Sequence, residues 1–164
     1  MKKTIVTLTG HTCSGKSYLL EHLASTGLFK KTPTITTRPP REGEVKDVDY
    51  FFIDEYQLKQ IQTSGFVELV KYGDYYYGMS KFYLDTVLNE DGIVTIICTP
   101  EGVAAYEKYC KENDIALVKA FVHTEEKVRL ERLMKRIYSG IKNDPSWIHH
   151  VEVGLMPLYK LLPL

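Results

Sequence analysis

The run from Gly10 to Ser17 has the residue types and the spacing of a loop that binds phosphate groups. It reads Gly-His-Thr-Cys-Ser-Gly-Lys-Ser and fits the pattern G-x-x-x-x-G-K-[ST]. Glycines in such a loop let the backbone curl until successive N–H groups point at one anion. Lys16 adds a positive charge for the terminal phosphates, and the Ser17 hydroxyl is placed to ligate a metal. The pattern therefore predicts a site for ATP with Mg²⁺ as its cofactor.

The flanking sequence supplies the elements that this loop requires. Thr4–Thr9 is rich in β-branched residues and predicts a buried strand, whereas Leu19, Leu20 and Leu23 share one face of a following helix. A glycine loop between a strand and a helix N-terminus forms an anion site. The residues that we expect to hold ATP in this loop are Thr12, Cys13, Ser14, Gly15, Lys16 and Ser17.

Strand-like and helical segments alternate along most of the remaining chain, which predicts a parallel sheet with helical crossovers. We expect helices over 54–63, 81–89, 101–112 and 124–137, and strands over 66–72, 75–79, 93–98 and 116–122. The stretch of about 33–79 interrupts the alternation with short, tyrosine-rich strands. We interpret it as an inserted subdomain that holds a second substrate, within one domain whose core is 1–32 and 80–164.

Two arginines near the start of this insert have the spacing of a second phosphate site. The two prolines between Arg38 and Arg41 favour polyproline II, which repeats every three residues, so both guanidiniums emerge on one side, about 9 Å apart. Paired guanidiniums suit a phosphate monoester. The alternative is a solvated loop with salt bridges to Glu42 and Glu44. Downstream of a phosphate-binding loop we favour the first interpretation, a kinase acting on a phosphorylated acceptor.

Composition limits the other classes of function. The chain has 164 residues, with 21 Lys and Arg against 21 Asp and Glu. A net charge of zero argues against a nucleic-acid polymer or a membrane surface as partner. No apolar run has membrane-spanning length, and the N-terminus does not resemble a secretory signal. Cys13, Cys98 and Cys110 have no metal-ligand spacing, which favours a reduced, cytoplasmic enzyme.

The segment 124–137 predicts a helix with two different faces. An apolar stripe at helical spacing is interpreted as core, and its members are Leu130, Leu133, Met134 and Ile137. Arg129, Arg132 and Arg136 lie three and four residues apart on another face. Like charges at this spacing destabilise a helix unless an anion lies among them.

Motifs beyond the loop resemble those of the guanylate kinase family. They are Thr36-Thr37-Arg38-x-Pro40-Arg41-x-Gly43-Glu44-Val45, then Asp49-Tyr50-x-Phe52, Gly65-Phe66-Val67-Glu68 and Gly73-x-x-Tyr76-Tyr77-Gly78-x-Ser80. They follow the loop in the family's order and spacing, over about 4–82. The resemblance implies transfer of the ATP γ-phosphoryl group to GMP or dGMP. It also implies an α/β P-loop kinase, a three-layer sandwich with a central parallel sheet, a mixed-β insert for the nucleoside monophosphate and a helical lid at about 137–147.

The same resemblance implies roles for individual residues. It places the acceptor phosphate on Arg38, Arg41, Tyr50 and Tyr77, and the guanine base near Thr34, Glu68 and Ser80. Glu68 would accept hydrogen bonds from the guanine N1–H and 2-amino groups, a donor pair that adenine lacks. Arg132 would pack near the adenine of ATP, and Arg136 would reach its phosphates during transfer. Lys16, Arg41 and Arg136 are therefore the expected catalytic residues.

The chain also departs from the family pattern. The family's Asp-x-Asp pair at the end of the central strand is absent here, where the chain reads Ile97-Cys98-Thr99-Pro100-Glu101-Gly102. Organisation of Mg²⁺ must then rest on Ser17, ATP and water, or on a carboxylate that the pattern does not identify, and the guanine loses a contact. Met79 follows the Tyr-Gly step where the family carries Ser or Thr. The apolar end of the chain, 155–164, is expected to dock on the core or on a second copy of the chain.

Two alternative functions stay open at this point. One is a nucleoside monophosphate kinase with a different or broader acceptor base, which Met79 and the missing aspartates favour. The other is a guanylate-kinase-like binding module without strong catalysis. Such modules typically lose the loop lysine and glycines, which this chain keeps at Gly10, Gly15 and Lys16.

Overall fold

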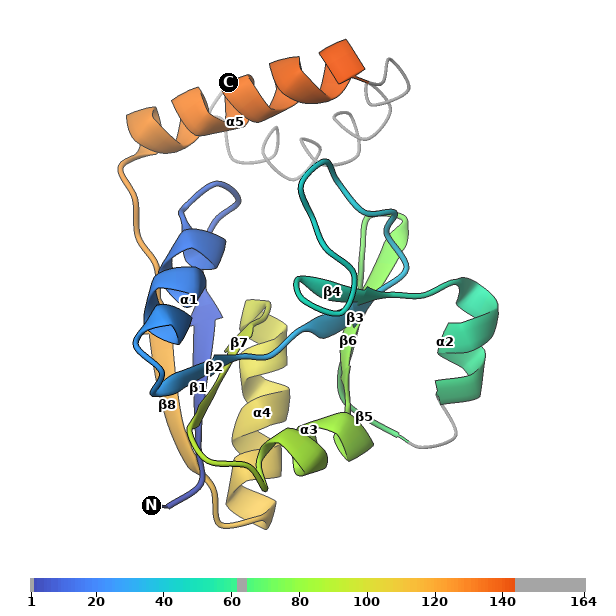
Figure 1. Ribbon diagram of the computed structural model, residues 1–164, viewed down its shortest axis with the longest axis vertical. Coiled ribbons are helices and arrows are strands. Elements are labelled where there is room, and N and C mark those ends of the chain that lie inside the picture. The colour runs from blue at the N-terminus through green and yellow to red at the C-terminus, as the bar shows by residue number, and fades with distance from the viewer. Residues whose placement is uncertain (1, 62–64, 144–164) are drawn as a thin grey trace.

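The structure is a computed structural model and describes residues 2–61 and 65–143, in which two separate sheets are the main feature (Figure 1). The larger sheet is parallel, in the order β2-β7-β1-β8. Its strands are β1 (Thr4–Thr9), β2 (Phe29–Lys31), β7 (Ile93–Ile97) and β8 (Ala116–Phe121). The smaller, mixed sheet has the order β4-β3-β6-β5. Its strands are β3 (Thr34–Thr36), β4 (Tyr50–Phe52), β5 (Phe66–Tyr72) and β6 (Tyr75–Ser80).

Helices cover both faces of the parallel sheet because its strands are apolar on both faces. Val6 and Leu8 pack with Leu20 of α1 (Lys16–Ser25) on one face. Alternate strand residues, among them Ile5 and Ile96, face α3 (Lys81–Val87) and α4 (Pro100–Glu112) on the other. These three layers, with the second sheet inserted between β2 and α3, confirm the predicted fold class. The remaining helix of the insert is α2 (Glu55–Ile61).

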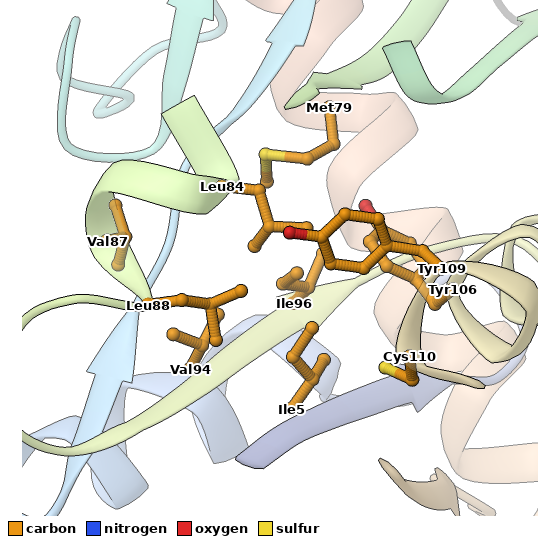
Figure 2. Close-up of a cluster of buried hydrophobic side chains, with 10 residues drawn as sticks. All are labelled: Ile5, Met79, Leu84, Val87, Leu88, Val94, Ile96, Tyr106, Tyr109 and Cys110. Carbon is orange, nitrogen blue, oxygen red and sulfur yellow. The ribbon is translucent and has the colours of Figure 1, made fainter. Parts of the chain in front are cut away.

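The main hydrophobic cluster joins the insert to the parallel sheet (Figure 2). Met79 from β6 is 1% exposed and packs there with Leu84 of α3 and Tyr106 of α4. Met79, which stands where the resembling family carries Ser or Thr, is therefore a core residue. The cluster fixes the carboxyl end of β7, and with it the N-terminus of α4, beside the insert.

Helix α5 (Glu126–Asn143) continues past the predicted end at Ile137, so it includes the first part of the predicted lid. The other lid residues, 144–147, and the apolar end at 155–164 lie outside the described residues. The prediction that the apolar stripe is core is wrong for two members: Leu133 is 9% exposed, but Leu130 is 42% and Met134 64% exposed. The reason is that α5 lies across the top of the molecule rather than against a sheet (Figure 1).

No helix in the described ranges has both the length and the apolar composition that crossing a bilayer requires. The three cysteines are all free.

Candidate active site

The loop between β1 and α1 has the backbone geometry of an anion cradle. Gly10 has φ 146°, Gly15 has φ 94°, and Cys13 between them has φ 63°. A Cβ on Gly10 would lie 2.5 Å from the carbonyl oxygen of Val122, so only glycine fits where the loop passes the end of β8. The Thr124 hydroxyl donates to the Ser14 carbonyl oxygen at 2.7 Å. This hydrogen bond connects the loop to the residues just before α5.

Lys16 lies across this cradle. Its Nζ donates to the carbonyl oxygens of Gly10 at 2.7 Å and His11 at 2.8 Å. Burial lowers the pKa of Lys16, the Cys13 thiol acts in the opposite direction, and the nearby Arg136 guanidinium lowers it further. A phosphate group between Lys16 and Arg136 would remove this repulsion.

Two observations test whether the loop fits ATP with Mg²⁺. The Ser14 hydroxyl is buried and has no hydrogen-bond partner among the described residues, which leaves a donor inside the cradle for a phosphate oxygen. Ser17 stands exposed in the first turn of α1, where a hydroxyl can join phosphate oxygens and water around Mg²⁺. Thr12 lies exposed on the rim of the loop. Within residues 2–61 and 65–143 no three His, Cys, Asp or Glu side chains gather as a metal site. The donors present therefore fit a metal held largely by the triphosphate.

Arg38 of the insert is a buried residue whose guanidinium is held by hydrogen bonds. It is 7% exposed, its Nη2 donates to both carboxylate oxygens of Glu44 at 2.9 Å, and its Nη1 donates to the Pro39 carbonyl oxygen at 2.7 Å. The guanidinium lies 5.5 Å from the ring centroid of Tyr50. Burial would lower the pKa of Arg38, but the Glu44 carboxylate raises it above its usual value, so the cation is firmly maintained. Within the part of the chain that the structure describes, the Arg38 Nε has no hydrogen-bond partner, so this donor is left for an anion.

Arg41 shares Glu44 with Arg38 but is more exposed. Its Nη1 lies 4.0 Å from Glu44 Oε1, its backbone N–H donates to Glu44 Oε2 at 2.8 Å, and 42% of its side chain is accessible. Burial lowers the pKa of Arg41, and the charges of Arg38 and Arg136 lower it further. The salt bridge to Glu44 from the solvated-loop alternative is present. It holds two guanidiniums side by side, as a phosphate site requires.

Tyr50 and Tyr77 complete this group. Their ring centroids are 6.3 Å apart, edge to face, and Tyr77 lies close enough to influence the charges of Arg38 and Arg41. Burial raises the pKa of Tyr50, which keeps its hydroxyl a neutral donor. Thr34 lies directly opposite Tyr50 in the β3–β4 register. The structure thus brings together the four residues predicted for the acceptor phosphate and places the Thr34 backbone next to them.

Glu68 and Ser80 occupy a different part of the insert, where its sheet meets α4. Glu68 on β5 is 6% exposed, and Thr99 donates to its Oε1 at 3.4 Å. Burial raises the pKa of Glu68 to about 7, against smaller opposing contributions from the Tyr106 hydroxyl and from Thr99. Ser80 is 8% exposed and precedes α3 as its N-cap residue. A carboxyl with this pKa exists in both protonation states near neutral pH.

Helix α5 carries its arginines over the phosphate loop. Arg132 Nη1 donates to the Cys13 carbonyl oxygen at 3.4 Å and lies 3.6 Å from where a Gly15 Cβ would stand. Arg136 lies close enough to lower the pKa of both Lys16 and Arg41. Arg129, not predicted as a site residue, is 8% exposed, and no residue in 2–61 or 65–143 forms a hydrogen bond with its Nη1.

Sequence reasoning also missed two residues beside Glu68. Thr99 is the N-cap of α4 and Gly102 lies in its first turn, with the Gly102 N–H donating to Thr99 Oγ1 at 3.0 Å. The run Thr-Pro-Glu-Gly does predict a helix start, since threonine is a good N-cap and proline suits the first helical position. Nothing in that local pattern indicates that a carboxyl from β5 lies above it.

A glycine loop with the backbone of an anion cradle on a parallel sheet, beside paired arginines on an inserted sheet, is the arrangement expected of a P-loop phosphotransferase for a phosphorylated acceptor. The chain belongs to the guanylate kinase family, whose model, described as guanylate kinase, matches residues 1–143. Family membership confirms the predicted resemblance and the predicted class of enzyme.

Individual relatives agree with the family match. Over 155 residues the chain is 30% identical to the guanylate kinase of Chlamydia felis, covering 93% of this chain and 72% of that protein. It is 32% identical over 138 residues to the guanylate kinase of Helicobacter pylori strain 26695, covering 80% and 64%. The crystal structure of guanylate kinase from Anaplasma phagocytophilum matches with a TM-score of 0.58 at 21% identity, over 73% of this chain and 59% of that one. The chain thus spans about three fifths to three quarters of these relatives' lengths.

Proposed function

We propose that the chain transfers the γ-phosphoryl group of ATP to GMP or dGMP, giving ADP and GDP or dGDP. The observation that carries this proposal is the convergence of three cations from three parts of the molecule. Arg136 of α5 lies close to both Lys16 of the phosphate loop and Arg41 of the insert. The repulsion of Arg136 with each of these cations favours an anion between them, and a phosphoryl group that passes from the loop to the insert supplies that anion.

Each group of residues then has a role in the transfer. The loop from Gly10 to Ser17 holds the ATP phosphates, and Lys16 neutralises charge on the β- and γ-phosphates. Arg38, Arg41, Tyr50 and Tyr77 hold the acceptor phosphate so that its oxygen attacks the γ-phosphorus in line. Arg136 stabilises negative charge on the equatorial oxygens of the transferring phosphoryl group. Such charge stabilisation is a main source of catalysis in phosphoryl transfer.

The base and the metal complete the proposal. Glu68 in its ionised form accepts from the guanine N1–H and 2-amino groups, with Thr34 and Ser80 near the base, and Arg132 packs near the adenine of ATP. Mg²⁺ bound with ATP would neutralise β- and γ-phosphate charge, with Ser17 as its protein ligand. We place the reaction in the cytoplasm, in keeping with three free cysteines.

An ADP-release assay with ATP, Mg²⁺ and a panel of ribo- and deoxynucleoside monophosphates tests this function. We expect turnover confined to GMP and dGMP, and loss of transfer in Lys16→Ala but not in Lys59→Ala, an exposed lysine on α2. Full activity of Lys16→Ala would contradict the role of the phosphate loop. Absence of turnover with ATP still bound would instead support a binding module.

One observation favours a second candidate, a kinase with a broader acceptor base. The position after the central strand holds Thr99, whose hydroxyl is already engaged with Gly102 and Glu68. A bound guanine would then contact one carboxyl, that of Glu68, where the family pattern also provides an aspartate. Turnover of another base in the same panel at a rate similar to GMP would establish this candidate.

A further inference from the structure

Glu68 is held at the junction between the insert and the core. It lies opposite Met79 in the β5–β6 register, after a register irregularity at Phe66–Glu68. Paired residues in antiparallel strands share a face of the sheet, so Glu68 points with Met79 toward α4. Met79 belongs to the hydrophobic cluster with Tyr106 (Figure 2). Glu68 is thus a carboxyl at the edge of the core.

The carboxyl of Glu68 rests on the first turn of α4. A Cβ on Gly102 would lie 1.9 Å from Glu68 Oε1 and 2.4 Å from its Cδ, so the carboxyl occupies the space that any other residue would fill. The N-terminus of a helix carries a partial positive charge that favours an anion. Gly102 therefore allows a carboxylate to lie at the positive end of α4.

Thr99 fixes the orientation of this carboxyl through its single hydroxyl. The oxygen accepts the Gly102 N–H at 3.0 Å, and the proton is donated to Glu68 Oε1 at 3.4 Å. A hydroxyl that accepts one hydrogen bond has its proton free for one donation. One side chain thus caps α4 and holds one oxygen of Glu68.

We propose that Thr99 is a positioning residue for recognition of the acceptor base: it acts through Glu68, whose carboxyl it holds in the orientation that receives the base. The proposal rests on the function proposed above. The hydrogen bond from Thr99 to Glu68 links α4, which begins just after β7, to β5 of the insert. Recognition of the base therefore depends on how the insert packs against the core. A carboxylate in place of Thr99 could not donate a hydrogen bond to Glu68, because a carboxylate has no proton to donate at neutral pH.

The surroundings of Glu68 make this hydrogen bond consequential. The titratable and charged groups that face it are Cys98 at the end of β7 and Glu101 and Tyr106 on α4. Cys98, with its pKa raised to about 12, and Tyr106 are neutral, and Glu101 repels a second negative charge. Thr99 is one of the few groups that favour the ionised carboxyl, which is the form that accepts from guanine.

Three variants separate this role from helix capping. Thr99→Val removes both the cap and the donor, whereas Thr99→Ser keeps both. Thr99→Gly removes the donor, but glycine remains a tolerated N-cap residue, so the helix start is largely kept. Should Thr99→Val fail to fold, Thr99→Gly carries the comparison with Thr99→Ser.

The experiment measures KM for GMP, kcat and KM for ATP in these variants, together with the titration of the Glu68 carboxyl by ¹³C NMR. We expect Thr99→Val and Thr99→Gly to raise KM for GMP roughly five- to tenfold. We also expect kcat and KM for ATP to stay within about twofold, the carboxyl to titrate at higher pH, and Thr99→Ser to behave as the parent protein. An unchanged KM for GMP in Thr99→Gly, or an equal loss of kcat, would overturn the proposal.

Failure of the proposed function would be recognised separately. If the parent protein did not phosphorylate GMP, that function would be wrong, and the carboxyl titration would still judge Thr99. A Glu68 titration that moves up in Thr99→Gly and returns in Thr99→Ser would support the hydrogen bond. A titration that does not move would overturn it.

Discussion

At the scale of single residues, burial of the Glu68 carboxyl, which we propose for base recognition, lowers the stability of the fold at neutral pH. Burial raises its pKa from 4.5 to about 7, so the folded protein binds this proton more tightly than the unfolded chain does. The stability contribution is complete below about pH 4.5 and is lost as the pH rises to about 7. At 1.36 kcal/mol per pH unit, the loss is of order 3 kcal/mol.

Glu68→Gln should remove this pH dependence, because an amide does not ionise. We expect the variant to be more stable than the parent at pH 8, and to gain much less or nothing at pH 4.5. Urea unfolding at the two pH values measures the difference. The variant should also show a weaker preference for GMP over AMP. Parallel pH profiles of stability would show that Glu68 ionises freely in the folded protein.

Arg41 carries a second prediction at this scale. Its side chain is 42% accessible and shares Glu44 with the buried Arg38, so Arg41→Ala leaves Glu44 paired and the fold intact. We expect KM for GMP to rise at least about tenfold, since hydrogen bonds to a charged phosphate are the strong kind. Steady-state kinetics measures this. An unchanged KM would mean that the arginine is only solvated, and Lys46→Ala, at an exposed lysine of the same loop, serves as the control.

At the scale of elements, the local pattern predicts well where one segment determines its own structure. The strand Thr4–Thr9, the loop and α1 were predicted because glycine positions and apolar periodicity lie within 25 residues. β2 was not predicted, because Phe29–Lys31 is three residues long with two lysines and becomes a strand only by pairing with β7. The apolar stripe of α5 was misjudged because periodicity shows a face, not what covers it.

The same limit applies to the candidate site. Arg38, Arg41, Tyr50 and Tyr77 were named from motifs, and the structure brings them together. The contact of Glu68 with Thr99 and Gly102 spans more than thirty residues between β5 and α4. No local rule predicts a contact between segments that only the tertiary fold brings together.

Gly10 gives a test at the element scale, because it is the point where the loop and β8 meet. Gly10→Ala adds both a strained φ of 146° and a contact of 2.5 Å with the Val122 carbonyl oxygen. Gly27→Ala is the matched control, since Gly27 has φ 76° and nothing within 4 Å of its Cβ position. We expect Gly27→Ala to cost about 1 kcal/mol and Gly10→Ala about 2 to 3 kcal/mol, with loss of ATP affinity. Equal unfolding free energies would show that the loop yields without cost.

At the scale of the whole molecule, α5 lies near both proposed phosphate sites, the loop before α1 and the arginines of the insert. It lies across the top of the structure, above the loop end of α1 and near the β3–β4 connection of the insert (Figure 1). Its arginines face these parts, whereas Leu130 and Met134 are exposed. Leu133 and the Arg132 hydrogen bond hold the helix, but the charge of Arg136 beside Lys16 and Arg41 is favourable only with an anion present, so the position of α5 is coupled to the substrates.

Arg136→Ala tests this coupling. Without nucleotides, Arg136 repels Lys16 and Arg41, so its removal should leave the melting temperature unchanged or raise it. In the presence of ATP and GMP the parent protein should gain more thermal stability than the variant, and kcat of the variant should fall at least about 10²-fold. Lys135→Ala, an exposed neighbour on α5, is the control and should match the parent in both measurements. If Arg136→Ala kept the parent's kcat and its nucleotide-dependent stabilisation, the three cations would be neighbours without a shared phosphate. The proposed transfer would then have to proceed without α5.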